Sequence, residues 1–270
     1  MEKRISSLEN QTLKDILKLK NKKYRYKENT YLIEGYRLVM DALKHRAPVA
    51  QILVSDVFDL SDSGKAFKKV FSSCESLIDY IILPEKIFDK LADTETPQGV
   101  LAAVRIKEYN FTNLMKEFKH KPFIITLDCV QDPGNLGTIL RTAEAAGVDF
   151  AIIIKGTTDP YSEKAVRASM GATFTLPIVQ LESSAELQKL EEYQVTHYVS
   201  SLQKASSYSE LSYDGGTNLI IGNEGFGVSE EIKNISHHTI KIPIYGKMES
   251  LNASVAAGIL LYKIAEKRLS

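Results

Sequence analysis

Two short runs of apolar residues constrain the fold of this chain most strongly. Phe123–Leu127 and Phe150–Ile154 are apolar at nearly every position rather than at every second one. A strand of this kind has both faces buried, as in parallel sheets that helices cover on both sides. Parallel strands also need long crossover connections, and a helical pattern lies between the two runs. The second half of the chain is therefore predicted to be an α/β domain on a largely parallel sheet.

The other elements follow from apolar spacing and turn residues. In the first half, strands are expected at 31–34, 51–55, 80–83 and 100–106, with helices at 10–25, 37–44, 65–71 and 85–91. In the second half, strands are expected at 123–127, 150–154, 174–179, 198–201, 219–221 and 239–243, with helices at 136–146, 163–170, 185–193, 230–235 and 252–267. The alternation predicts a small α/β sandwich followed by a second α/β domain. Because 105–121 becomes polar, the domains are placed at 1–107 and 122–270, with a linker at 108–121.

Composition excludes several classes of protein. No apolar run approaches the roughly 18 residues that span a membrane, and the N-terminus lacks the apolar core of a signal peptide. Cys74 and Cys129 are too few for a disulfide framework and have no metal-ligand spacing. We therefore expect a cytoplasmic protein without a metal site.

The net charge of zero hides an asymmetry. The first 27 residues carry nine basic and three acidic side chains. A basic surface is what binding to a phosphate backbone requires, although such a run is more often a solvated helix face. The candidate RNA contacts are Lys20, Lys22, Lys23 and Arg25.

Three polar, glycine-rich segments are the strongest functional signal. They are 132–141, 221–227 and 242–254, called here the first, second and third segments. Each begins where a β-branched run ends, and ligands of open α/β folds bind beyond the carboxyl ends of strands. The three segments are thus expected to form one composite site.

The polar residues of these segments have structural roles when each is taken alone. Asn135 is expected to cap a helix, and Arg141, two turns into that helix, has the position of a surface charge. Glu224 lies between glycines, while Ser250 and Asn252 flank another helix start. As a set they contain no histidine, cysteine nucleophile or metal cluster. This inventory excludes hydrolysis by a triad or a metal, and it suits orienting a hydroxyl nucleophile beside a cofactor that backbone groups bind.

In this order and spacing, the segments resemble the motifs of the SpoU/TrmH family of S-adenosylmethionine-dependent RNA ribose 2′-O-methyltransferases, in the SPOUT superfamily. Asn135 with Arg141-Thr142 is similar to the first family motif, 223–227 to the second and 250–256 to the third. Residues 33–35 and 96–100 are similar to the substrate-binding domain of many members, which resembles the small α/β RNA-binding fold of several ribosomal proteins.

The resemblance implies a trefoil-knotted catalytic domain, a homodimer and S-adenosylmethionine as cofactor. The cofactor would be bound by residues of the second and third segments, listed here: Gly222, Asn223, Ile242, Pro243 and Leu251. The family assigns activation of the ribose hydroxyl to Arg141. A guanidinium is effectively always protonated, so we favour stabilisation of the developing alkoxide instead. Orienting roles fall to Asn135, Glu224, Ser250 and Asn252.

Three alternatives stay open. An N-terminal RNA-binding domain favours 23S rRNA as the substrate, with tRNA second. Other SPOUT branches methylate a base nitrogen, although their motifs differ from Asn-Glu-Gly and Ser-Leu-Asn. The chain could also be a non-catalytic RNA-binding protein, but its complete set of catalytic positions argues against this.

Overall fold

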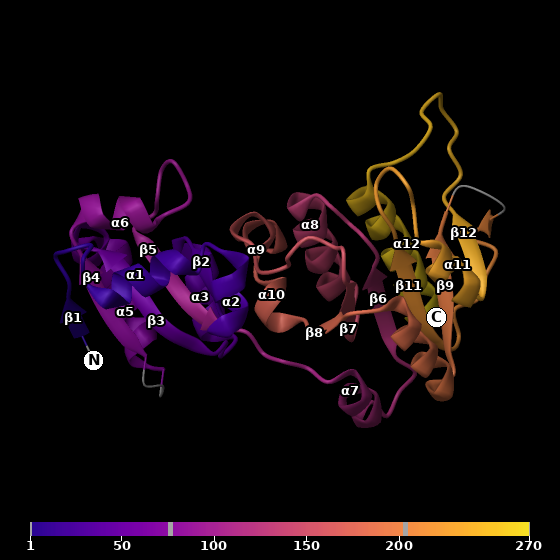
Figure 1. Cartoon of the computed structure of the whole chain (residues 1–270), viewed down its shortest axis with the longest axis horizontal. Helices are drawn as coiled ribbons and strands as arrows, with labels where there is room; N and C mark the ends of the chain where they lie inside the picture. Colours follow the sequence, from indigo (N-terminus) through magenta and orange to yellow (C-terminus); the bar gives the residue numbers. More distant parts are fainter. Residues whose placement is uncertain (1, 75–77, 202–204, 270) are drawn as a thin grey trace. The chain divides into compact units, whose positions relative to one another are not determined.

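The computed structural model describes residues 2–74, 78–201 and 205–269, and the chain forms two compact units (Figure 1). Unit 1 contains the chain up to Lys107 together with Tyr161–Thr175. Unit 2 contains Glu108–Pro160 and the chain from Leu176 onward. The expected division into 1–107, 108–121 and 122–270 differs from this grouping, because a later stretch of the chain is part of unit 1. That contiguous division stays a prediction.

Unit 1 is built on a mixed five-stranded sheet of order β1-β4-β3-β5-β2. β1, β4 and β3 are parallel, whereas β5 runs antiparallel to both β3 and β2. The strands are β1 (Glu2–Arg4), β2 (Thr30–Glu34), β3 (Val49–Ser55), β4 (Asp79–Leu83) and β5 (Val100–Arg105). The helices are α1 (Gln11–Lys18), α2 (Lys22–Lys27), α3 (Tyr36–Lys44), α4 (Asp56–Leu60), α5 (Asp62–Ser72), α6 (Glu85–Leu91), α9 (Glu163–Ser169) and α10 (Ala172–Thr175).

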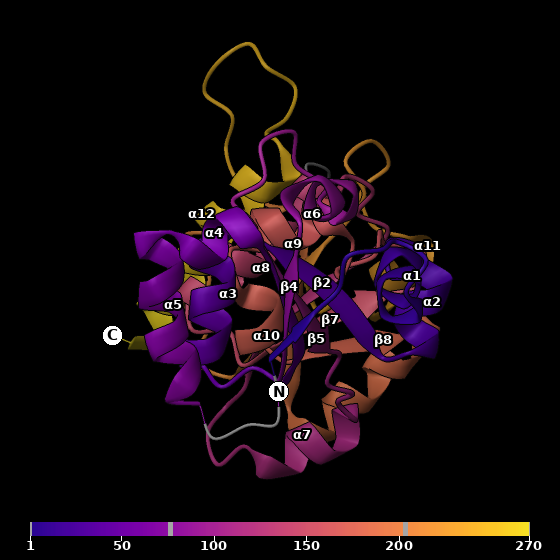
Figure 2. The same cartoon turned by 90° about the vertical axis from the view of Figure 1, so that its left-hand side faces the viewer.

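Helices lie on both sides of this sheet, as Figure 2 shows for α1 and α2 on one side and α3, α4 and α5 on the other. Apolar side chains of α1 and α6 pack against one face of the strands, with Leu13, Leu53 and Phe88 buried in the same cluster. The prediction of an α/β sandwich for the first half is thus confirmed in its layers.

One helix expected at 10–25 is two helices. α1 ends at Lys18, and the side chain of Asn21 then accepts a hydrogen bond of 2.9 Å from the backbone N–H of Lys23. An asparagine in this position starts a new helix, because it satisfies an N–H group that would otherwise lack a partner. The prediction of a single continuous helix was therefore wrong.

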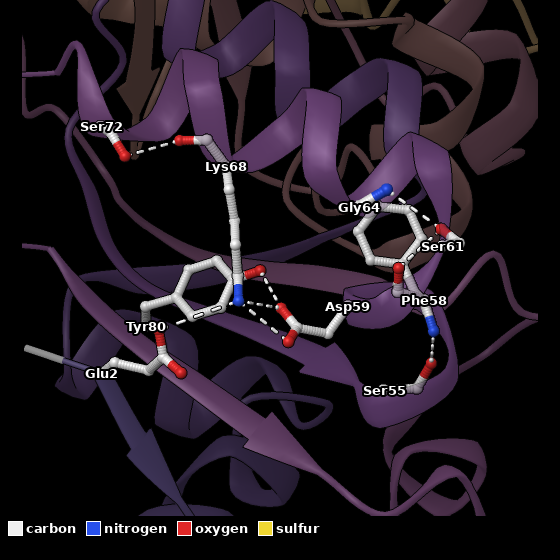
Figure 3. A network of polar contacts seen from close by, with 9 residues as sticks. All are labelled: Glu2, Ser55, Phe58, Asp59, Ser61, Gly64, Lys68, Ser72 and Tyr80. Atoms are coloured by element: carbon white, nitrogen blue, oxygen red, sulfur yellow. Dashed lines mark hydrogen bonds and ion pairs between the residues drawn. The ribbon is translucent and has the colours of Figure 1, made fainter.

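A buried carboxylate holds together three elements of unit 1. Asp59 is 6% exposed and accepts hydrogen bonds from the Tyr80 hydroxyl (2.8 Å) and the Lys68 ammonium (2.9 Å). Lys68 also lies 3.8 Å from Glu2 of the edge strand, as Figure 3 shows. Burial and the Asp59 carboxylate raise the pKa of Tyr80, so its hydroxyl remains a donor. Glu2, Asp59, Lys68 and Tyr80 are called the Asp59 network below.

Unit 2 is built on a seven-stranded sheet of order β10-β12-β9-β11-β6-β7-β8, parallel at each of its six strand pairings. The strands are β6 (Phe123–Leu127), β7 (Phe150–Ile154), β8 (Ile178–Leu181), β9 (Val195–Ser200), β10 (Ser206–Ser207), β11 (Gly216–Ile221) and β12 (His238–Lys241). The helices are α7 (Phe111–Glu117), α8 (Pro133–Ala145), η1 (a 3₁₀ helix, Ser184–Tyr193), α11 (Glu230–Ile235) and α12 (Ala253–Leu269). The predicted parallel sheet is confirmed, and the knot stays a prediction.

Helices α7, η1 and α11 contribute to a core cluster with β7, β8, β9 and β11. Helices α8 and α12 pack against each other, and α12 also packs against β11. Gly258 lies close enough to α8 that a Cβ atom there would be 3.6 Å from the Thr142 methyl group. The small-residue face of the last helix therefore serves close packing within the chain.

One expectation for the region before β8 was wrong. The stretch expected as a strand at 174–179 is helical over Ala172–Thr175, and β8 begins only at Ile178. Pro177 lacks the N–H group that a ladder needs, which delays the strand. The linker expected at 108–121 contains α7, and Phe111, Leu114 and Met115 of this helix are buried in the core of unit 2.

Candidate functional site

The first segment begins with a helix cap that leaves Asn135 available. The Asp132 carboxylate accepts a hydrogen bond of 2.8 Å from the backbone N–H of Asn135, and Pro133 occupies the first position of α8. Proline suits that position, since its missing N–H would have no partner there. The expectation that Asn135 caps the helix was wrong, and its side chain is free for another role.

The side chains of three segments meet at Asn135. Its amide nitrogen donates to a Glu224 carboxylate oxygen at 3.0 Å, and its amide oxygen accepts from the Asn252 side chain at 3.0 Å. These residues follow β6, β11 and β12, so the structure brings all three predicted segments together. Asn135, Glu224 and Asn252 are called the three-loop network below.

Glu224 is held as an ionised acceptor. Partial burial raises its pKa, but hydrogen bonds from Asn135 and from the backbone N–H groups of Gln131 and Asp132 outweigh burial, and the pKa of Glu224 lies below its ordinary value. The Gln131 N–H donates at 3.2 Å and that of Asp132 at 3.4 Å. A carboxylate in this state orients donors and does not release a proton near neutral pH.

The second segment is a tight loop that Asn223 closes. Its backbone exchanges hydrogen bonds of 2.7 and 2.9 Å with Gly227, and its side-chain oxygen accepts from the N–H groups of Gly225 and Phe226 at 2.8 and 3.0 Å. The amide nitrogen of Asn223 donates to the carbonyl of Cys129 at 2.9 Å, which ties this loop to the stretch between β6 and the first segment. Asn223 therefore shapes the loop rather than pointing into solvent.

Gly222 has no room for a side chain. A Cβ atom there would lie 2.3 Å from the carbonyl carbon of Gly227. Gly227 itself has a φ of +73°, which L-amino acids rarely adopt. The loop therefore requires glycine at 222 for lack of space and favours it at 227 for its backbone conformation.

The third segment ends in a helix cap made by Asn252. Its side-chain oxygen accepts from the N–H and hydroxyl of Ser254 at 2.9 and 2.6 Å. The same side chain donates to Asn135, so the cap of α12 and the three-loop network share one residue. Ser250 is exposed and, within the described part of the chain, makes no hydrogen bond.

Arg141 is carried by α8, the same helix as Asn135. It lies six residues after Asn135 on α8, about 9 Å farther along the helix axis, and its side chain is exposed. It forms no hydrogen bond or ion pair with any residue the structure describes. A permanent positive charge is thus held on the helix that also carries Asn135.

The remaining predicted cofactor residues offer free backbone groups. Across the residues that the structure describes, the backbone from Ile242 to Leu251 makes no hydrogen bond. This stretch projects from unit 2 between β12 and α12 (Figure 1). Ile242 and Pro243 are half-buried, and Leu251 is 38% exposed. Unsatisfied N–H and C=O groups beside apolar side chains fit a cofactor such as S-adenosylmethionine, which has polar ends and an apolar ring face.

The candidate RNA contacts in unit 1 divide into two groups. Lys22 and Lys23 are exposed, as expected. Arg25 is 5% exposed and donates to the carbonyls of Leu19 and Lys20 at 2.9 and 2.8 Å. The expectation for Arg25 was wrong, because its guanidinium satisfies the carbonyls that follow α1 and is not available to a phosphate.

Lys20 is also tied to the protein. Its ammonium donates to the carbonyl of Ala92 at 3.0 Å. Lysine 20 therefore anchors the stretch after α6, and Lys22 and Lys23 remain the stronger candidates for RNA.

The two N-terminal motifs lie side by side in unit 1. The Gln98 side chain accepts from the N–H of Tyr36 at 2.8 Å, and the N–H of Gly35 donates to the carbonyl of Val100 at 3.0 Å. Glu34 accepts from the N–H of Asp93 at 2.7 Å. The sequence motifs were noted separately, and their hydrogen bonds to each other, which hold the stretch between α6 and β5 against the end of β2, were missed.

The described part of the chain contains neither a cluster of metal ligands nor a membrane-spanning helix. No group of three histidine, cysteine, aspartate or glutamate side chains there could hold a metal ion. Among the described helices, none has the length and apolar character needed to cross a membrane.

Known proteins share both halves of this chain. Residues 122–262 match the SpoU rRNA Methylase family, and residues 10–102 match the MRM3-like substrate binding domain. The chain is 37% identical over 97% of its length to a Bacillus subtilis protein named 23S rRNA (guanosine(2553)-2'-O)-methyltransferase RlmP, of which 99% is covered.

Solved structures agree with these matches. An AdoMet-bound rRNA methyltransferase from Sinorhizobium meliloti has a TM-score of 0.86 and 29% identity, covering 100% of this chain and 99% of that one. The SpoU methyltransferase AviRb from Streptomyces viridochromogenes, in complex with AdoMet, has a TM-score of 0.85 and 25% identity, covering 97% and 99%.

Proposed function

The chain belongs to the SpoU rRNA methylase family, and from this premise we propose that it methylates a ribose 2′-hydroxyl of 23S rRNA. It is an S-adenosylmethionine-dependent RNA 2′-O-methyltransferase. The observation that carries the proposed chemistry is the three-loop network, which is built on the helix that also holds Arg141, a residue with no partner among those the structure describes.

Arg141 stabilises the reacting oxygen. The cofactor supplies a methyl group already activated by a positively charged sulfur, so the barrier lies mainly in orienting the hydroxyl and accommodating its developing negative charge. A guanidinium cannot accept the proton, because it is already protonated. It donates hydrogen bonds to the oxygen as charge develops, which is the most effective use of a fixed donor. The oxygen–methyl bond forms as the methyl–sulfur bond breaks, and the hydroxyl proton leaves late, through a neighbouring phosphate oxygen of the RNA.

The three-loop network positions the ribose and the arginine. Glu224 accepts hydrogen bonds from Asn135 and is ionised, so it fixes which way the Asn135 amide points. Asn252 fixes the other end of the same amide. Ser250 is exposed beside this pair, with a hydroxyl available to the substrate. Groups held in this way lower the entropic cost of aligning nucleophile and methyl group.

The cofactor is bound by the second and third segments. Gly222 and Asn223 shape one wall, and the free backbone groups near Ile242, Pro243 and Leu251 form the other. This assignment rests on the unsatisfied backbone groups described above and on the family's use of these positions.

We propose that a second copy of the chain covers one face of α12. Val255, Ile259 and Tyr262 are 52%, 37% and 55% exposed and recur at the spacing of one helix face. An exposed apolar stripe of this kind is typical of a protein interface. The resemblance to the family implies a homodimer, and sedimentation of the Ile259→Asp variant tests it: a monomer is expected, and an unchanged dimer would contradict this interface.

The choice of 23S rRNA rests on the full-length similarity to the Bacillus protein of that name and on the match of residues 10–102 to a substrate binding domain. Lys22 and Lys23 are exposed basic groups of unit 1, and we assign them contacts with the RNA backbone. We place tRNA second.

The test is transfer of labelled methyl groups to purified 23S rRNA and tRNA, followed by nuclease digestion that separates ribose-methylated from base-methylated products. We expect 2′-O-methyl nucleotides from 23S rRNA. Label in tRNA alone would change the substrate, and label on a base would change the reaction. Absence of transfer together with RNA binding would favour a non-catalytic RNA-binding protein.

A further inference from the structure

Phe226 is the most exposed phenylalanine that the structure describes, with 93% of its surface accessible. It occupies the variable position of the second motif, between Gly225 and Gly227. An apolar side chain scattered on a surface needs no explanation by itself. Two further observations separate Phe226 from that case.

The backbone beneath Phe226 is rigid. Its N–H donates to the Asn223 side chain at 3.0 Å, and Asn223 and Gly227 exchange backbone hydrogen bonds across the loop. Gly222 leaves no free space at the base of the loop. The ring is therefore presented to solvent from a hydrogen-bonded loop, and it is 93% exposed among the residues that the structure describes.

This loop adjoins the catalytic residues. Phe226 follows Glu224 by two residues, so their Cα atoms are at most about 7 Å apart. Glu224 in turn contacts Asn135. A ribose held between the three-loop network and Arg141 would have its base within reach of the phenyl ring.

We propose that Phe226 stacks on the base of the nucleotide whose ribose is methylated. This inference rests on the proposed function, because it concerns how the RNA substrate is oriented at the same site. An unpaired base displayed on an aromatic ring is a common mode of RNA recognition. Stacking tolerates every base, so Phe226 sets the position of the ribose and does not select the nucleotide.

The first experiment measures RNA methylation by Phe226→Ala, Phe226→Leu and Phe226→Trp. Loss of one base–aromatic contact is worth roughly 5- to 150-fold, so Phe226→Ala and Phe226→Leu should lower kcat/KM for RNA by about 10-fold or more, and Phe226→Trp should retain it. Leu60→Ala, which truncates a 71% exposed apolar side chain on α4, is the matched control and should have no effect. Full activity in Phe226→Leu would overturn stacking, because leucine keeps the apolar surface without the ring.

The second experiment uses an RNA without the base at the mapped target nucleotide. Wild-type protein and Phe226→Ala should methylate that RNA equally, since the stacking partner is gone. A difference that persists would overturn the assignment to the target base. Affinity for S-adenosylmethionine and the sedimentation coefficient should be the same in all variants; a change of oligomeric state in Phe226→Ala would instead assign the ring to an interface between copies.

These results separate the two proposals. If the wild-type protein methylates no ribose, the proposed function fails and stacking fails with it. If wild-type protein is active and Phe226→Ala equals it, only the stacking proposal fails.

Discussion

Unit 1 and unit 2 each contain a carboxylate at the centre of a polar network, but the two networks differ in what they leave unsatisfied. In the Asp59 network, the carboxylate is 6% exposed and both partners belong to the protein. In the three-loop network, Glu224 is exposed and the neighbouring Arg141 has no described partner. A buried and satisfied network stabilises the fold, whereas an exposed network with unused donors can act on a ligand.

The difference leads to opposite expectations for mutation. Changes in the Asp59 network should lower the free energy of unfolding and leave the activity of folded protein unchanged. Changes around Glu224 should lower activity and leave the free energy of unfolding nearly unchanged. Each of the following variants tests whether a network acts on stability or on activity.

The largest effect is expected for Arg141→Ala. Removing a donor that stabilises developing negative charge typically lowers kcat by about 10²- to 10³-fold, or about 3 to 4 kcal/mol of transition-state stabilisation. Stability should change by less than about 0.5 kcal/mol, because the side chain is exposed and unpaired. Single-turnover methylation and urea unfolding measure the two quantities. A rate close to wild type would remove Arg141 from the chemistry, and Arg141→Lys, which keeps the charge without the planar fork, should recover only part of the rate.

Asp59→Ala should produce the complementary result. It leaves the Tyr80 hydroxyl without its acceptor and the Lys68 ammonium without its main partner. Because Lys68 is about a third exposed, we discount the ion pair and expect a loss of about 2 kcal/mol in unfolding free energy. Denaturant unfolding measures the loss, and kcat of the folded protein should be unchanged. Tyr80→Phe, which removes only one donor, is the milder control.

Glu224→Gln should lower kcat by roughly tenfold, or about 1.4 kcal/mol, because a neutral amide fixes the Asn135 side chain less firmly than a carboxylate. The effect is smaller than that of Arg141→Ala, since Glu224 acts through Asn135. The pKa of Glu224 lies below its ordinary value, so the wild-type contribution should persist across neutral pH and disappear only in acid. An unchanged kcat in Glu224→Gln, measured with saturating RNA, would show that the charge is dispensable.

The smallest effect concerns a third network, in the core of unit 2. Asn218 of β11 accepts from Thr126 of β6 at 2.8 Å and contacts the His197 ring of β9 at 3.1 Å. Burial, with a smaller contribution from His237, lowers the pKa of His197 to about 4. The stability that this neutral ring contributes is present above the unfolded pKa of about 6.5 and is lost as pH falls toward 4.

Lowering the pH from 7 to 5.5 should therefore decrease the free energy of unfolding by about 1 kcal/mol through His197. Glu163 of unit 1 acts in the opposite direction: burial raises its pKa to about 7, so its contribution is present at low pH and is lost as pH rises through 7. Comparing wild type with His197→Gln across this range isolates the histidine. Parallel pH profiles for the two proteins would contradict the assignment.

Elements with strong local signals were predicted closely. The strands Phe123–Leu127 and Phe150–Ile154 and the helices Glu85–Leu91 and Glu230–Ile235 have the predicted bounds, because apolar runs, caps and breakers agree at both ends. The stretch at 174–179 was mispredicted because its β-branched and aromatic residues favour a strand. Only Pro177 and the preceding Gly171 oppose that reading.

The candidate site was predicted as a set but not in its details. Sequence motifs placed Asn135, Glu224 and Asn252 in one site, and the structure joins them by hydrogen bonds. Charge pattern alone did not show that Arg25 is buried, because solvation of a guanidinium depends on which carbonyls lie nearby. Phe226 carried no sequence signal, since exposure of one ring is decided by the tertiary structure.

Tyr161–Thr175 belongs to unit 1, although it is synthesised after Glu108–Pro160 of unit 2. This order has a consequence for folding during synthesis. A nascent chain that has emerged only to Lys107 lacks α9 and the Tyr161 ring, which lies 4.9 Å from Tyr31 of β2. At ordinary rates of translation, the missing piece follows on the order of 10 s later. During that interval β2 is exposed to solvent or to chaperones, so slow codons between the two stretches should increase aggregation of the newborn chain more than slow codons after Thr175.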